Sequence, residues 1–221
     1  LKEFAKRHPV GSGYLTRLFT DSAFVADSIN VKTLQSGLFA VLTNDQSHHG
    51  REWLLEEVFS PDEIHALWLN RNANWYLRGG NTPLTHGMVP FMERNLLTNI
   101  IESADTAMVS PKISANLRYG HDTVLCPLAA LMEIGNCGAV FDNLDDVAAT
   151  WRDYRIIPMA ANIQMIFYRP EGSLNPDDVL VKVLLNEHEM TLPVATGSAP
   201  YYKWTDLRRY YTDKLASYHT R

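Results

Sequence analysis

The chain has 221 residues, of which 46% are hydrophobic and 20% are charged. This composition is typical of a globular protein with enough apolar residues for a sizeable core. The formal net charge is −5 and no cluster of Lys and Arg stands out. Because nucleic-acid binding needs a basic surface, the composition argues against such a partner. The longest apolar stretches, residues 125–132 and 179–185, are too short for a transmembrane helix.

The sequence begins at Leu1 without an initiator Met and shows no signal peptide, so we expect a processed chain or a fragment. Its two cysteines, Cys126 and Cys137, are compatible with one disulfide or with two buried free thiols. No His pair at ligand spacing accompanies them, and the pair alone cannot form a zinc site. The sequence therefore indicates no metal and no organic cofactor.

The first hundred residues carry helical patterns. Apolar residues at three-to-four spacing predict a helix over residues 21–42, followed by a polar break at residues 45–50. Residues 60–63, Ser-Pro-Asp-Glu, form a capping box with proline at the first helical position. The helix that they start should end at the two glycines 79–80, and another helix is expected over residues 89–108.

The pattern changes after Pro111, where strands become frequent. The predicted elements are a strand over 113–119, a helix from about Thr123, a strand over 163–168, a hairpin of strands 179–185 and 190–194 across residues 187–189, and a last helix over 206–218 capped by Thr205. A helical block followed by this mixed block predicts an α/β layer with a helical subdomain. We place the boundary between a mainly helical part, residues 1–110, and an α/β part, residues 111–221.

Residues 114–128 read Ser-Ala-Asn-Leu-Arg-Tyr-Gly-His-Asp-Thr-Val-Leu-Cys-Pro-Leu. The predicted strand ends at Gly120, so His121 and Asp122 should lie between its carboxyl edge and the start of the next helix. Ligands of open α/β sheets bind at that edge, and a helix N-terminus attracts anions such as phosphate. The ordinary alternative is that Asp122 is a structural helix cap and His121 a surface or half-buried residue.

Residues 117–128 resemble the H-D proton-donor motif of histidine acid phosphatases. Four further segments are similar to the bacterial branch of this family, which is itself similar to multiple inositol polyphosphate phosphatases. These segments are residues 18–25, 59–68, 158–169 and 181–187. The likeness runs in order from about Arg17 to about Lys214.

The resemblance implies a phosphomonoesterase that acts through a phosphohistidine, with inositol polyphosphates such as phytate as substrates. In this chain His121 would contact the phosphoryl group, and Asp122 would protonate the leaving oxygen. Arg118, Met159 and Ala160 are candidate substrate-binding residues. Their ordinary alternatives are a solvent-facing strand residue for Arg118 and a buried strand entry for the other two.

The resemblance also implies a phosphoglycerate-mutase-like, three-layer α/β sheet, in which residues 1–110 form a helical cap. It favours the periplasm or the cell exterior. The nucleophile of the family lies in a first signature, R-H-G-x-R-x-P, which this chain lacks, since Arg7-His8-Pro9 has neither the glycine nor the second arginine. We therefore expect a C-terminal half that is incomplete and inactive alone.

An incomplete sheet would expose strand edges, and open edges pair with other chains. The expected partners are thus a phosphorylated small molecule and either the N-terminal half of the same enzyme or a second copy of this chain. The alternative is a non-catalytic phosphate-binding or interaction module derived from the same fold. A third possibility is that the chain resembles such enzymes in its fold only.

Overall fold

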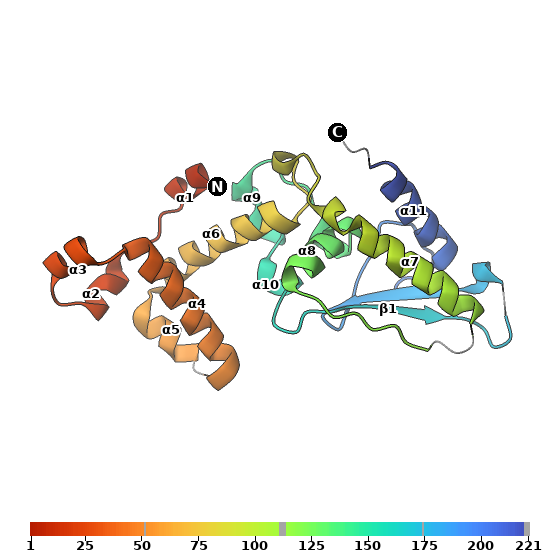
Figure 1. Ribbon diagram of the computed structural model, residues 1–221, viewed down its shortest axis with the longest axis horizontal. Coiled ribbons are helices and arrows are strands. Elements are labelled where there is room, and N and C mark those ends of the chain that lie inside the picture. The colour runs from red at the N-terminus through yellow and green to blue at the C-terminus, as the bar shows by residue number, and fades with distance from the viewer. Residues whose placement is uncertain (51, 111–113, 174, 219–221) are drawn as a thin grey trace. The chain divides into compact units, whose positions relative to one another are not determined.

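The computed structural model describes residues 1–50, 52–110, 114–173 and 175–218 (Figure 1). By its internal packing the chain divides into two compact units, Leu1–Ala73 and Asn74–Arg221. The division falls inside helix α6 (Pro61–Gly79). The boundary predicted at residue 110 separates a helical cap from the α/β part, which is a different kind of division. This boundary stays a prediction.

The first unit is built of helices only, within the residues that the structure describes. They are α1 (Lys2–Arg7), α2 (Gly13–Leu18), α3 (Ser22–Ser28), α4 (Val31–His49), α5 (Glu52–Val58) and the first part of α6. Its core contains Tyr14, Leu42, Leu55 and Phe59, which are all buried. The rings of Tyr14 and Phe59 lie 5.0 Å apart, so α2 is held against the end of α5 by an aromatic contact.

The capping box at the start of α6 is confirmed. The amide of Ser60 donates to Glu63 Oε2 (2.8 Å), and the amide of Glu63 donates to Ser60 Oγ (3.3 Å). Glu63 also accepts hydrogen bonds from the amide of Tyr14 (3.1 Å) and from Arg17 Nη1 (3.3 Å). This buried carboxylate therefore joins the start of α2 to the start of α6. Burial raises the pKa of Glu63, but the hydrogen bonds from Ser60, Tyr14 and Arg17 together outweigh it and lower the pKa.

The helix predicted over residues 21–42 is two helices, α3 and α4, because the chain is extended at Ile29. Asn30 then accepts from the amide of Thr33 (3.0 Å), as a residue that starts a helix does. The predicted break at residues 45–50 is wrong, since α4 continues to His49. Asp45 and His49 are one turn apart and their side chains meet at 2.8 Å, which stabilises this last turn.

The second unit contains the rest of α6 and the other helices that the structure describes after it. They are η1 (Pro83–Thr85), η2 (Pro90–Glu93), α7 (Arg94–Val109), α8 (Asp122–Leu131), η3 (Gly135–Gly138), α9 (Leu144–Thr150), α10 (Asp153–Ile156), η4 (Pro176–Asp178) and α11 (Trp204–Ala216). The predicted end of α6 is confirmed at Gly79, where a Cβ atom would lie 2.5 Å from Cys126 Sγ. Glycine is required here because α6 ends in close contact with α8.

Four short strands form one antiparallel sheet in the second unit. They are β1 (Ile163–Tyr168), β2 (Leu180–Leu185), β3 (His188–Glu189) and β4 (Tyr202–Lys203), and β2 pairs with each of the others. Along β2 the side chains of Val181, Val183 and Leu185 are buried, as expected for a strand with one face on the core. Trp204 at the start of α11 packs edge-on against Phe167 of β1, with ring centroids 5.1 Å apart.

The predicted strands at 163–168 and 179–185 are confirmed, but the strand predicted at 190–194 is wrong. Asn186 and Glu187 have positive φ angles of 51° and 67° and form a two-residue turn. This tight turn brings His188 and Glu189 back onto β2, with Leu185 opposite His188. The hairpin therefore closes earlier than the apolar pattern suggested.

The strand predicted at 113–119 is also wrong as far as the structure describes it. Residues 114–120 are exposed and have no regular secondary structure, and Ile113 lies outside the described residues. No backbone hydrogen bond links residues 114–120 to the backbone of another described residue. A strand needs a neighbouring strand to satisfy its backbone, and β1 pairs only with β2 in the described chain.

The remaining helix predictions are confirmed with small shifts. α7 begins at Arg94, after the short helix η2, and α8 begins at Asp122. α11 starts at Trp204 with Lys203 before it, so Thr205 is inside the helix and does not cap it. The fold is mixed α/β, mostly helical, with a small antiparallel sheet. The three-layer arrangement stays a prediction.

Candidate functional site

The predicted catalytic pair lies at the exposed start of α8. Six consecutive residues, from Cys126 to Leu131, are buried and anchor this helix in the core. His121 occupies the N-cap position with an extended backbone (φ −114°, ψ 162°), and Asp122 is the first helical residue. Both side chains are exposed. A firmly packed helix thus presents the two residues to solvent.

The local hydrogen bonds of this pair are few. Asp122 Oδ1 accepts from the amide of Thr123 at 2.7 Å, which satisfies one of the free amides of the first turn. The carbonyl of His121 accepts from the amides of Val124 and Leu125, both at 3.0 Å, while its side chain makes no capping bond. One oxygen of Asp122 is left without a hydrogen bond to the described residues, so it can face a ligand.

Arg118 binds to helix α7. Its Nη2 donates to the side chains of Asn99 (2.9 Å) and Ser103 (2.8 Å), and more weakly to the carbonyl of Asn99 (3.4 Å). Its Nη1 donates to Asn116 Oδ1 (3.2 Å). These bonds fix the exposed segment 114–120 to α7 just before His121. Asn99 and Ser103 could not be predicted as partners of Arg118, because they lie on a separate helix.

Met159 and Ala160 lie in the loop between α10 and β1. The side chain of Met159 is 64% exposed, and Ala160 has a positive φ of 59°. The loop is held near its end by Asn162, whose backbone N–H donates to Asn186 Oδ1 at 3.0 Å. No hydrogen bond or ring contact recorded for the described residues joins this loop to the pair at the start of α8. The predicted buried strand entry is therefore wrong for Met159, which faces solvent.

The two cysteines are free and buried. Burial, with smaller contributions from Cys137, Asp153 and Asp122, raises the pKa of Cys126 to about 12. Burial likewise raises the pKa of Cys137 to about 12. Of the two alternatives open from the sequence, the structure has two unreactive thiols.

Within residues 1–50, 52–110, 114–173 and 175–218, which the structure describes, no group of three His, Cys, Asp or Glu side chains could hold a metal ion. Over the same ranges, no helix is both long and apolar enough to cross a membrane. In the Arg7-His8-Pro9 segment, Arg7 is the last residue of α1 and His8 follows the helix. The ring of His8 lies 4.4 Å from that of Phe4.

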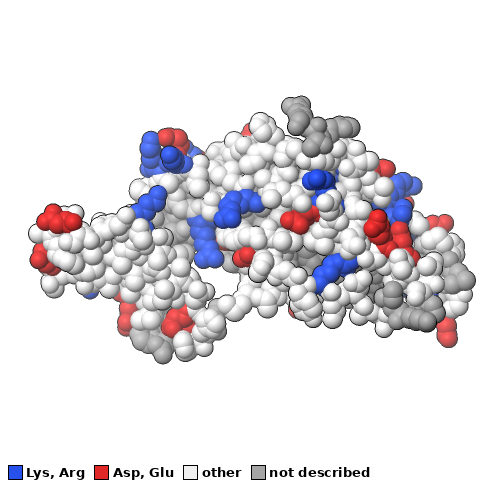
Figure 2. Space-filling model, in the orientation of Figure 1, with Lys and Arg blue, Asp and Glu red and all other residues white. Residues whose placement is uncertain are grey.

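Figure 2 shows Lys and Arg interspersed with Asp and Glu on the face that it draws, without a continuous basic stripe.

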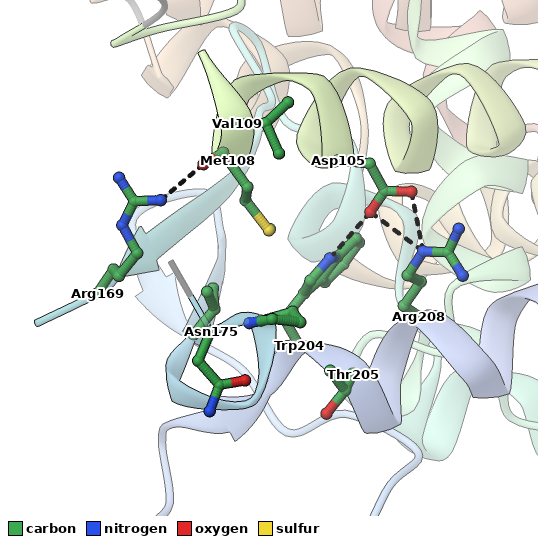
Figure 3. A pocket seen from close by; sticks show the side chains of 10 residues that line it. Asp105, Met108, Val109, Arg169, Asn175, Trp204, Thr205 and Arg208 are labelled. Carbon is green, nitrogen blue, oxygen red and sulfur yellow. Dashed lines mark hydrogen bonds and ion pairs between the residues drawn. The ribbon is translucent and has the colours of Figure 1, made fainter. Parts of the chain in front are cut away.

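The second unit contains a pocket of about 400 Å³ (Figure 3). Its walls come from the end of α7, the residue after β1, the turn η4 and the start of α11. The sequence did not predict this pocket, because its lining residues come from four separate segments.

Among known proteins the chain is similar to multiple inositol polyphosphate phosphatase 1 of Gallus gallus, with 26% identity over 174 residues. This relative is a histidine acid phosphatase, the family that the motif pattern resembles. The match covers 73% of this chain and 37% of the relative, so the chain spans little more than a third of the relative's length. No protein-family model matches the chain.

Proposed function

We propose that this chain is part of a phosphomonoesterase of the histidine acid phosphatase type, in which Asp122 protonates the leaving group. The observation that carries the proposal is the exposed His121-Asp122 pair at the start of the buried helix α8. Free amides and the helix dipole at that position favour a phosphoryl group. The distant similarity to an inositol polyphosphate phosphatase supports the same chemistry.

Hydrolysis of a phosphate monoester needs a nucleophile, cations for the phosphoryl oxygens and an acid for the alkoxide. In the proposed reaction His121 contacts the phosphoryl oxygens, and Asp122 gives its proton to the departing oxygen. The nucleophilic histidine belongs to an R-H-G-x-R-x-P signature that this sequence does not contain. We therefore expect no turnover from this chain alone.

Inositol polyphosphates such as phytate are the proposed substrates, by analogy with the inositol polyphosphate phosphatase to which the chain is similar. Met159 and Ala160 are proposed to line the substrate pocket, and Arg118 to act beside the phosphoryl group. The helical residues 1–110 would form the cap over that pocket. The proposed location, the periplasm or the cell exterior, rests on the resemblance alone.

The missing nucleophile half is the proposed partner. Residues 114–120 have no regular secondary structure and no backbone hydrogen bond to the backbone of another described residue, and one edge of β1 has no described neighbour. The side chains of Leu117 and Tyr119 are 73% and 93% exposed, which is costly for apolar groups. A strand from the other half would satisfy both the backbone and these side chains. Self-association through the same edge is the alternative.

The test is an Asp122→Asn substitution in a longer protein that contains both this chain and the first signature. Loss of the acid should lower kcat on an alkyl phosphate or phytate by about 10²- to 10⁴-fold. p-Nitrophenyl phosphate should suffer much less, because its leaving group needs no proton. The matched control is Asp146→Asn, since Asp146 is an exposed acid in the first turn of α9. Equal losses on both substrates would refute the assigned role.

The second candidate is a non-catalytic phosphate-binding module, in which the exposed start of α8 would hold the anion without chemistry. If the chain is such a module, its 221 residues would bind inositol hexakisphosphate. A longer protein that contains the chain would also fail to hydrolyse this compound. Calorimetry with this chain and a phosphate-release assay with the longer protein separate the two. Release of phosphate that depends on Asp122 excludes the module.

A further inference from the structure

The pocket in the second unit has a preformed apolar floor. Trp204 and Val179 are only 1% and 2% exposed, and they line the pocket together with Met108 and Pro176. The indole of Trp204 is fixed, because its Nε1 donates to Asp105 Oδ1 at 3.3 Å and its ring packs on β1. A volume of about 400 Å³ lies within the range of small-molecule sites.

Two arginines flank this floor on opposite sides (Figure 3). Arg208 Nε donates to both oxygens of Asp105, at 2.9 and 3.1 Å. Arg169 Nη1 donates to the carbonyl of Met108 at 2.6 Å. Each guanidinium is thus held by one nitrogen, and its other nitrogens make no hydrogen bond to the described part of the chain.

The charges of the lining do not cancel. Among the described residues that line the pocket, Asp105 is the one acid, and its carboxylate accepts hydrogen bonds from Arg208 and the indole of Trp204. Arg169 is bound only to a neutral carbonyl, so its positive charge has no counterion among the residues that line the pocket. An anchored guanidinium with free N–H groups is preorganised for a carboxylate or phosphate.

We propose that this pocket binds a small organic anion with an aromatic or branched apolar body. The apolar body would lie against Met108 and Pro176, above the buried floor of Trp204 and Val179, and the anionic group would accept hydrogen bonds from Arg169. Inorganic phosphate alone fits poorly, because most of the lining is apolar. A cation is disfavoured by the uncompensated Arg169. This site goes beyond the proposed phosphatase chemistry and does not depend on it.

The experiment uses three probes on the whole 221-residue chain, measured by calorimetry or ligand-detected NMR. The probes are 3-phenylpropionate, its uncharged amide 3-phenylpropionamide, and inorganic phosphate. We expect 3-phenylpropionate to bind with a Kd below about 1 mM. Because the uncharged amide cannot form a charge-assisted hydrogen bond with Arg169, it should bind at least about 10-fold more weakly.

Two variants and a control locate the binding. Arg169→Gln should weaken binding of 3-phenylpropionate about 10-fold, and Thr205→Trp, which fills the pocket, should abolish it. Arg209→Gln is the control. Arg209 is on α11, as Thr205 is, but it pairs with Asp206 at 2.9 Å and does not line the pocket. Its affinity should equal that of the unchanged chain, and circular dichroism checks that each variant is folded.

Three results would overturn the proposal. The first is no binding of 3-phenylpropionate at several millimolar. The second is equal affinity for the acid and its amide, which requires no variant and so stays informative if a variant fails to fold. The third is an equal loss of affinity in Arg169→Gln and Arg209→Gln, because that would reflect overall charge and not this pocket.

Discussion

Replacing Arg118 with methionine should free the segment before His121 from helix α7. Methionine keeps much of the length of the side chain but removes every hydrogen bond to Asn99, Ser103 and Asn116. Since the guanidinium is solvent-exposed, we expect the set to contribute only about 1–2 kcal/mol. This free energy corresponds to a preference of roughly 5- to 30-fold for the attached segment.

The assay is the ¹⁵N order parameter of the backbone amides at residues 117–120. We expect values near 0.85 in the unchanged chain and below about 0.6 in Arg118→Met, because no backbone hydrogen bond to other described residues restrains this segment. Arg209→Met, which removes a single exposed ion pair on α11, is the control and should leave these values unchanged. Unchanged order parameters in Arg118→Met would refute the reasoning.

Glu63→Gln should lower the free energy of unfolding by about 2–4 kcal/mol in urea titrations, because one oxygen that accepts buried amide hydrogens becomes a donor. The pKa of Glu63 is lowered in the fold, so its contribution to the free energy of unfolding is present above the unfolded pKa near 4.3 and is lost as pH falls through the folded pKa. If Glu63→Gln lost stability with falling pH just as the unchanged chain does, this reasoning would be wrong. Cys126 and Cys137, whose pKa values are raised to about 12, should not react with Ellman's reagent at pH 8 until the chain is denatured. Gly79→Ala should lower the free energy of unfolding by about 1–3 kcal/mol, measured by thermal unfolding. An unchanged melting temperature would count against the close contact with Cys126.

Local signals in the sequence predicted the elements that local interactions define. Residues 60–63 carry both halves of the capping box, and the start of α6 follows directly. The strand prediction at 163–168 succeeded because apolar and β-forming residues are concentrated there. The break predicted near residue 45 failed, since polarity alone does not show that Asp45 and His49 pair across one turn.

The candidate site could be predicted only in part, for a related reason. His121 and Asp122 could be singled out as candidates because the dipeptide and its flanks form a continuous motif. The strand predicted before them was wrong because no described strand pairs with residues 114–120, and pairing is a non-local property. The contact of Arg118 with Ser103 and the pocket around Trp204 also join distant segments, which no window of sequence reveals.

Because six consecutive residues of α8 are buried, the direction in which Asp122 points is fixed by the interior of the second unit. An α-helix turns about 100° per residue, so a repacked interior that rotates α8 even slightly would swing the carboxylate sideways. Substitutions far from solvent, at Leu128 or Leu131 for example, would then change the direction of this carboxylate as well as the stability of the fold. Tests of the proposed role of Asp122 should therefore include the hydrophobic interior.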